Sequence, residues 1–342
     1  MNKFKLAVYI GRFQPFHNGH LETLKQGLAI ADKVVMVLGS YKKSHSYKNP
    51  FSFEERVEMI KSSISQEESQ RIIFEPIRDE YAKGDDVWVA NVEDAVHKHC
   101  KDDSEIVLIG KYKDASTYYI ERFNKWVFQT TTAQINISAS LVREIIFSAG
   151  FPSRLVPAGV AAFLEKNYIG TNKQIEHAEE WAVIEKYKKS WAGSPFPPIF
   201  VTVDPVVVCK RHVLLIRRGH APGKGHLAMP GGFLEVSETL QASAVRELLE
   251  ETNIDVEPSD RLHYSITGTE TFDHPLRGDR GRIITHAFLF NLDRLEEVVK
   301  LPEVKGGDDA AEAMWVKISD LDSIEEEIYS DHFGIIKKMI FG

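Results

Sequence analysis

Two histidines three residues apart, His17 and His20, form the first stretch of the chain that could do chemistry. They lie where a short apolar run (residues 6–10) gives way to residues with helical spacing, which places the pair at a turn from strand to helix. The first turn of a helix offers unpaired backbone N–H groups and the positive end of the helix dipole. With Arg12 beside them, the two imidazoles suit the negative charge that develops on a phosphoryl group during its transfer.

The glycines of this segment, Gly11 and Gly19, allow the backbone to approach a ligand closely. The P-loop pattern Gly-x-x-x-x-Gly-Lys-Ser/Thr does not occur in the sequence, so the predicted phosphate site is of another kind. By spacing alone, the histidine pair has a simpler interpretation, as two surface histidines or half of a metal site. The strand–turn–helix setting favours the phosphate site.

A second candidate site contains three glutamates, Glu247, Glu250 and Glu251, which fall within about 100° of arc at helical spacing. Carboxylates crowded in this way repel one another unless a hard divalent cation lies between them. The alternative is a solvated acidic face. Because Gly231–Gly232 and Glu238 precede the helix at fixed offsets, we favour a magnesium or manganese site.

The composition of the 342 residues is that of a globular protein, with 43% hydrophobic and 27% charged residues, and its length suggests two domains or one large one. The net charge of -8 argues against a dedicated nucleic-acid binder or a protein of anionic membranes. The sequence shows no secretory signal and no run of about 18 apolar residues. Two cysteines, Cys100 and Cys209, make no disulfide framework, so we expect a reducing, cytoplasmic location.

The first half of the chain alternates short apolar runs with helical patterns, which predicts an α/β fold with a Rossmann-like, doubly wound parallel sheet. Ligands of such sheets bind at the carboxyl ends of the strands, near the switch in strand order. Ser52 and Glu55 form a capping box that starts one of the helices. The strands are expected at 4–10, 33–38, 71–77, 105–109 and 127–131, with helices after residue 18 and residue 52 and over 85–99 and 140–148.

A cluster of Gly, Ser and Pro at 193–198 predicts the domain boundary. The first domain is then 1–192, with a polar connector helix at about 173–191, and the second is 193–342. The second domain is predicted to be α+β with a mixed sheet. We expect strands at 199–208, 213–217, 262–272 and 282–292, and helices at 239–252 and 332–340.

The segment from Gly11 to His20 resembles the His-x-Gly-His signature of nucleotidyltransferases, in the form found in archaeal-type nicotinamide mononucleotide adenylyltransferases. Further similar stretches follow in order: Asn49-Pro50-Phe51-Ser52 with Glu55-Arg56, Trp88-Val89, and Ile137 to Arg143. The resemblance implies that the phosphate of nicotinamide mononucleotide attacks the α-phosphate of ATP and that pyrophosphate leaves. Mg²⁺ would accompany ATP.

The same resemblance implies roles for single residues. Phe13 and Trp88 are candidates for stacking on the pyridine ring, and packing in the core is the alternative for both. Asp85 stands where that family has an asparagine, and Ser140 replaces a threonine. The implied catalytic residues are Arg12, His17, His20 and Arg143, and the implied ATP- and mononucleotide-binding residues are Gly11, Phe13, Gly19, Lys48, Asn49, Arg56, Trp88 and Ser138.

The second site resembles the Nudix box, Gly-x5-Glu-x7-Arg-Glu-U-x-Glu-Glu-x-Gly-U, where U is aliphatic, with Asn253 in place of the second glycine. Asparagine tolerates the left-handed conformation that ends a helix. The resemblance implies hydrolysis of a nucleoside diphosphate, with Arg246 orienting the acidic side chains and Glu250 serving as ligand or base. The implied metal ligands are Glu238, Glu247, Glu250 and Glu251.

Residues 272–282 resemble the loop and strand of ADP-ribose-processing Nudix domains, and Arg277, Arg280 and Arg282 would bind that substrate; a basic surface loop is the alternative. Together the two signatures resemble the bacterial bifunctional adenylyltransferase/Nudix hydrolase family. The expected partners are ATP, nicotinamide mononucleotide and ADP-ribose, with neither nucleic acid nor membrane, and a homo-oligomer is compatible with the sequence. The alternatives are another nucleotidyltransferase, a Nudix domain that senses its ligand without catalysis, or hydrolysis of another nucleoside diphosphate.

Overall fold

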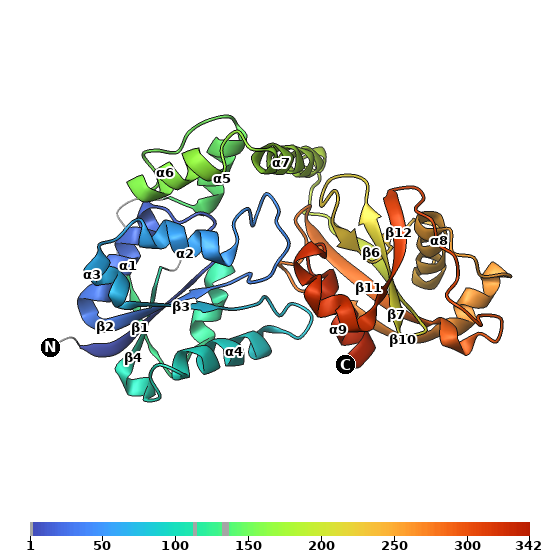
Figure 1. Ribbon diagram of the computed structural model, residues 1–342, viewed down its shortest axis with the longest axis horizontal. Coiled ribbons are helices and arrows are strands. Elements are labelled where there is room, and N and C mark those ends of the chain that lie inside the picture. The colour runs from blue at the N-terminus through green and yellow to red at the C-terminus, as the bar shows by residue number, and fades with distance from the viewer. Residues whose placement is uncertain (1–2, 112–114, 132–136) are drawn as a thin grey trace. The chain divides into compact units, whose positions relative to one another are not determined.

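The computed structural model describes residues 3–111, 115–131 and 137–342 (Figure 1). Its contacts divide the chain into two compact units, Met1–Glu80 with Gly84–Ala178, and Tyr81–Lys83 with Glu179–Gly342. Within the described ranges, no helix is both long and apolar enough to cross a membrane.

A five-stranded sheet in the order β3-β2-β1-β4-β5 forms the centre of the first unit. All its strand pairs are parallel, so the predicted doubly wound sheet is confirmed. The strand order reverses between β1 and β4, which places the switch point at their carboxyl ends, near Gly11 and Gly110. The strands are β1 (Phe4–Gly11), β2 (Ala31–Leu38), β3 (Ile72–Pro76), β4 (Ile106–Gly110) and β5 (Val127–Thr130).

Helices cover both faces of this sheet, with α1 and α2 on one face and α4 on the other (Figure 1). Successive side chains of a strand point to opposite faces of the sheet, so the core is divided between the two helical layers. Leu6 and Val8 pack with Val92 and Val96 of α4, whereas the side chain of Ile109 lies against α1 at Gly27. The helices are α1 (Asn18–Ile30), α2 (Phe53–Lys61), α3 (Gln66–Gln70), α4 (Asp85–His97), α5 (Ala139–Phe147) and α6 (Ala158–Asn167).

The second unit is built on a mixed sheet with the main order β10-β11-β6-β7-β12, as the predicted α+β domain requires. β6 and β11 are parallel and the other neighbours are antiparallel. α8 (Leu240–Thr252) packs on one face and α9 (His332–Phe341) on the other. The strands are β6 (Ile199–Cys209), β7 (His212–Arg218), β8 (Leu227–Ala228), β9 (Gly232–Phe233), β10 (Ile266–Phe272), β11 (Arg282–Asn291) and β12 (Ala310–Lys317).

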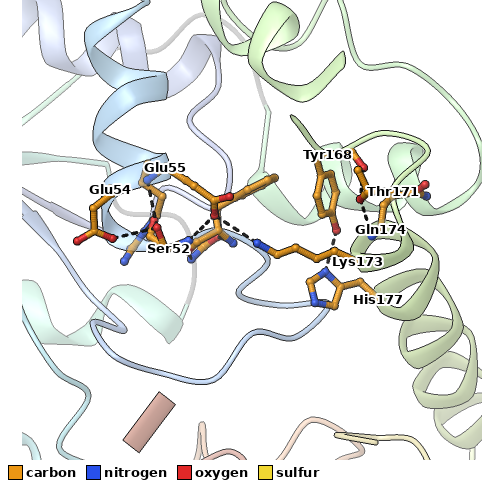
Figure 2. A network of polar contacts seen from close by, with 11 residues as sticks. Ser52, Glu54, Glu55, Tyr168, Thr171, Lys173, Gln174 and His177 are labelled. Carbon is orange, nitrogen blue, oxygen red and sulfur yellow. Dashed lines mark hydrogen bonds and ion pairs between the residues drawn. The ribbon is translucent and has the colours of Figure 1, made fainter. Parts of the chain in front are cut away.

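α7 (Asn172–Ser190) matches the predicted connector helix. Its beginning belongs to the first unit: the Nζ atom of Lys173 lies 3.3 Å from Oε2 of Glu55, and the buried hydroxyl of Tyr168 lies 2.9 Å from Nδ1 of His177 (Figure 2). Glu55 is also part of the expected capping box with Ser52. The later part of α7 belongs to the second unit, because the division falls between residues 178 and 179.

The position at which the second unit begins can be tested with fragments of the chain. Ile184 is fully buried, and the carboxylate of Glu180 accepts the N–H of Gly223 at 2.9 Å. A fragment that starts at residue 193, the boundary expected from the sequence, lacks the buried Ile184 and the Glu180 carboxylate. We expect fragment 179–342 to melt about 5 °C or more above fragment 193–342, because removing a buried aliphatic side chain alone costs about 2–5 kcal/mol. Equal melting temperatures, measured by circular dichroism, would place the boundary at 193.

Candidate active sites

His17 and His20 cap the start of α1 reciprocally. Nδ1 of His17 accepts the backbone N–H of His20, and Nδ1 of His20 accepts the backbone N–H of His17, both at 3.3 Å. The two rings are stacked, with centroids 3.5 Å apart. Because each Nδ1 is an acceptor, a neutral imidazole in either position carries its hydrogen on Nε2. The hydrogen-bearing nitrogen of both rings is then Nε2, and the pair lies at the positive end of a helix, next to the switch point.

Phe13 supports this pair from within the core. It is 1% exposed, and its ring meets the edge of His20 at 4.9 Å and of Tyr9 at 5.1 Å between centroids. A Cβ atom on Gly11 would lie only 2.9 Å from Cζ of Phe13, so this glycine makes room for the aromatic ring. The ring of Phe13 thus packs in the core of this unit, and its stacking on the pyridine ring stays a prediction. Gly19 is buried in the first turn of α1.

Gln14 and Arg56 hold the neighbouring loops together. The side-chain amide of Gln14 donates to the carbonyl of Phe51 at 2.8 Å and accepts its N–H at 3.0 Å. Nη1 of Arg56 donates to the carbonyls of Arg12 and Gly39, each at 2.8 Å. Burial lowers the pKa of Arg56 to about 10. This cation thus ties together the ends of β1 and β2. Its predicted contact with ATP or nicotinamide mononucleotide stays a prediction.

Asp79, which sequence reasoning missed, joins the carboxyl ends of three strands. It follows β3, and its carboxylate accepts the backbone N–H of Ser40 at 3.2 Å and its hydroxyl at 2.8 Å. The Nζ atom of Lys43 lies 3.6 Å away. Burial opposes the charge, but Lys43, Ser40 and Arg12 outweigh it and hold the pKa of Asp79 below its usual value. Asp79 is therefore the counter-charge to the cations on this edge.

The other predicted residues of this unit take varied positions. Nη1 of the buried Arg143 donates to the carbonyl of Gln14 at 2.6 Å, and the hydroxyl of Ser138 caps α5 by accepting the N–H of Leu141.

Lys48 and Trp88 are half-buried, and the Trp88 indole packs edge-on against Tyr119 and Phe123. Asp85, at the start of α4, is paired with Arg122. Asn49 is 5% exposed, and its Oδ1 atom has no hydrogen-bond partner among the described residues.

In the second unit, Arg246 lies at the centre of the acidic side chains. Its guanidinium holds Glu238 through two hydrogen bonds of 2.8 and 3.0 Å, and Nη1 reaches Glu247 at 2.9 Å and Glu250 at 2.8 Å. Consequently, the described residues contain no group of three acidic, histidine or cysteine side chains arranged around one point. Asn253 adopts the left-handed conformation at the end of α8, with φ 41°, as predicted.

Glu247 and Glu251 are the buried members of this set. Burial raises the pKa of Glu247, and it raises the pKa of Glu251 to about 8 although the N–H of Gly231 donates to that carboxylate at 2.8 Å. A Cβ atom on Gly232 would lie 2.5 Å from Oε1 of Glu247, so only glycine allows the backbone to come this close. The carboxyl groups of Glu247 and Glu251 are thus buried beside Gly232 and Gly231, where burial makes their ionised form unfavourable.

The three arginines of residues 272–282 have different partners. Arg277 is 8% exposed, and its guanidinium is paired with Asp331 through two hydrogen bonds of 2.9 and 3.2 Å. Arg282 is paired with Asp273. Arg280 lies over the rings of Phe233 and Tyr187. Arg277 is therefore held in place by Asp331, and its predicted contact with ADP-ribose stays a prediction.

Comparison with known proteins decides the family. A cytidylyltransferase-like model matches residues 8–145, and a NUDIX domain model matches residues 200–339. The nicotinamide/nicotinic acid mononucleotide adenylyltransferase of Acinetobacter baylyi is 37% identical over 166 residues, which are 48% of this chain and 87% of that protein. A crystal structure from Francisella tularensis, a bifunctional NMN adenylyltransferase/ADP ribose pyrophosphatase complexed with AMP and Mn ion, matches with a TM-score of 0.90 and 33% identity over 98% of each chain.

The chain belongs to the bifunctional nicotinamide mononucleotide adenylyltransferase/Nudix hydrolase family. Its first unit is the adenylyltransferase domain and its second the Nudix domain. A further relative of the adenylyltransferase domain, from Pyrococcus furiosus, is 30% identical over 165 residues, covering 47% of this chain and 84% of that protein. The family recognised from the two motifs is thereby confirmed, as is the fold of both domains.

Proposed function

We propose that the adenylyltransferase domain transfers AMP from ATP to nicotinamide mononucleotide, and that the Nudix domain hydrolyses ADP-ribose to AMP and ribose 5-phosphate. The observation that carries the first activity is the reciprocal capping of His17 and His20, which engages Nδ1 of both rings at the start of α1, just after the carboxyl end of β1. The observation that carries the second is the burial of Glu247 and Glu251 beside Gly232. Both thiols, Cys100 and Cys209, are unbridged, which supports a cytoplasmic location.

In the transfer reaction, a phosphate oxygen of nicotinamide mononucleotide attacks the α-phosphorus of ATP, and the bond to the β-phosphate breaks as pyrophosphate leaves. His17, His20 and Arg12 stabilise the charge on the α-phosphoryl oxygens, which is the main requirement of this reaction class. Asn49 is placed to receive a hydrogen bond from the mononucleotide, because its buried Oδ1 acceptor has no partner among the described residues. The first turns of α1 and α5 offer N–H groups to phosphates.

By their chemistry, though not by their present arrangement around Arg246, the carboxylates of the Nudix box suit a divalent cation. Glu238, Glu247, Glu250 and Glu251 are all carboxylates, the ligands that Mg²⁺ and Mn²⁺ prefer, and a cation would offset the unfavourable charge of the two buried members. When bound, it lowers the pKa of the attacking water and neutralises the diphosphate. Glu250, the most exposed of the four, accepts the proton of that water, which attacks phosphorus as the bond to the bridging oxygen breaks. Arg246 orients the carboxylates.

Product analysis tests both activities. The full chain is incubated with ATP, nicotinamide mononucleotide and Mg²⁺, and separately with ADP-ribose and Mg²⁺ or Mn²⁺. NAD with pyrophosphate, and AMP with ribose 5-phosphate, are the expected products. If ADP-ribose is bound but left intact with both metals, the Nudix domain is a sensor. Turnover of another nucleoside diphosphate alone would correct the substrate.

Asp79→Asn provides a prediction for the adenylyltransferase domain. Asparagine preserves the shape and one acceptor for Ser40, but it removes the counter-charge of Lys43 and Arg12. Hydrogen bonds to charged groups contribute about 1.5–3 kcal/mol, so we expect NAD synthesis to slow by about 10-fold or more. Asp94→Asn, at an exposed aspartate of α4, is the control. Rates equal to wild type in both variants would show that Asp79 does not position the cations.

A further inference from the structure

Tyr168, which directly follows α6, packs against the loop that contains Asn49 and Phe51. Its ring meets the ring of Phe51 edge-on, with centroids 4.9 Å apart and the planes at 64°. Both rings are buried, with exposed fractions of 2% and 3%. Edge-on aromatic pairs have a preferred geometry and stabilise more than the burial of their surface alone. The position of the Phe51 ring therefore depends on that of Tyr168.

The first turns of α7 fix the Tyr168 ring in turn. The Tyr168 hydroxyl lies 2.9 Å from Nδ1 of His177, a side chain that is also buried (Figure 2). The same part of α7 is bound to two other helices: Lys173 is paired with Glu55 of α2, and the side-chain amide of Gln174 donates to a carbonyl of α5 at 3.5 Å. A buried hydrogen bond between such anchored elements specifies one position of the ring.

Phe51 connects this packing to the residues of the transfer reaction. Its backbone N–H and carbonyl both bond to the side chain of Gln14, and the carbonyl of Gln14 accepts the guanidinium of Arg143. Asn49 lies two residues before Phe51, and its buried Oδ1 atom has no hydrogen-bond partner within the described ranges. A displacement of Phe51 would therefore move the acceptor that Asn49 presents.

We propose that Tyr168 and His177 are positioning residues of the adenylyltransferase site, an inference that rests on the proposed adenylyl transfer. They act through Phe51 and hold Asn49 where it receives nicotinamide mononucleotide. A displacement of about 1 Å in a group that positions a substrate can cost about 10²-fold in rate. Both residues lie beyond residues 8–145, the part that the cytidylyltransferase-like model matches, so the beginning of the connector helix takes part in this activity.

Steady-state kinetics of NAD synthesis by the full chain test the proposal. Tyr168→Phe keeps the ring beside Phe51 and removes the hydroxyl, whereas His177→Leu removes its partner. In both variants we expect KM for nicotinamide mononucleotide to rise about 5-fold or more, with kcat and KM for ATP within about two-fold of wild type, because Asn49 contacts the mononucleotide alone. His177→Asn keeps a polar atom for the Tyr168 hydroxyl and should restore most of the affinity.

The matched control is His97→Leu, which removes a histidine of the same unit that is paired with Asp103 at 2.8 Å. Melting temperatures of the two leucine variants measure their loss of stability. An unchanged KM for nicotinamide mononucleotide in both Tyr168→Phe and His177→Leu would overturn the proposal. An equal rise of both KM values, or the same rise in His97→Leu, would also overturn it, since the effect would then come from stability.

Failure of the proposed function gives a different result. If the wild type forms no NAD from ATP and nicotinamide mononucleotide, adenylyl transfer is wrong, and calorimetry with nicotinamide mononucleotide replaces the kinetics. The positioning role then stands only if Tyr168→Phe weakens a binding event that His97→Leu leaves intact.

Discussion

Replacing His20 by alanine should reduce NAD synthesis by about 10²–10³-fold. This is the usual cost of removing one preorganised hydrogen-bond donor that stabilises charge in the transition state. The imidazole of His20 supplies an Nε2–H donor at the start of α1, and its Nδ1 atom fixes the backbone of His17. The substitution removes the donor and loosens the second histidine. Hydrolysis of ADP-ribose should not change, because His20 belongs to the adenylyltransferase domain.

Steady-state rates for both reactions, measured on the same preparation, check this result. Loss of a helix cap costs about 0.5–2 kcal/mol, so the melting temperature should fall only slightly. His97→Ala is the matched control: it removes a half-buried histidine that is paired with Asp103 at 2.8 Å, away from the switch point. NAD synthesis by His20→Ala within a few-fold of wild type would contradict the catalytic assignment.

The strands of the adenylyltransferase domain were predictable because local sequence determines them. Each predicted range overlaps the observed strand and ends within two residues of it, since buried parallel strands are apolar on both faces. β12 was missed, because Ala310–Lys317 contains small and charged residues and lies at the edge of its sheet, next to β7 alone. β8 and β9 are two residues long and leave no periodic pattern.

The candidate sites were likewise predictable only where local sequence determines them. The His17–His20 pair and the box around Arg246 depend on spacings within one helix, which sequence reveals. The contacts of Asp79 with Ser40 and of Arg277 with Asp331 join residues 39 and 54 positions apart. A single sequence contains no signal that pairs such residues. Asp79 stood two residues past an expected strand end, which is the one hint that could have marked it.

Glu251→Gln should slow ADP-ribose hydrolysis by about 100-fold or more and weaken its dependence on Mg²⁺ and Mn²⁺, because a buried carboxylate that faces the proposed cation is lost. Glutamine retains the acceptor for the N–H of Gly231. NAD synthesis should not change. Metal titrations of both activities measure the effect, and Glu326→Gln, at an exposed glutamate, is the control. Normal hydrolysis by Glu251→Gln at low metal concentration would show that Glu251 does not hold the cation.

Melting curves with a chelator test the same carboxylate independently of activity. Burial raises the pKa of Glu251 from 4.5 to about 8, so the folded protein binds this proton more tightly than the unfolded chain. The resulting contribution to stability is full below about pH 4.5 and is lost as the pH rises toward 8. Glutamine does not ionise, and Glu251→Gln should therefore melt above wild type at pH 8 but not at pH 5. Saturating Mn²⁺ should reverse this order at pH 8, because the wild type binds the cation through one more carboxylate than the variant does and therefore gains more stability.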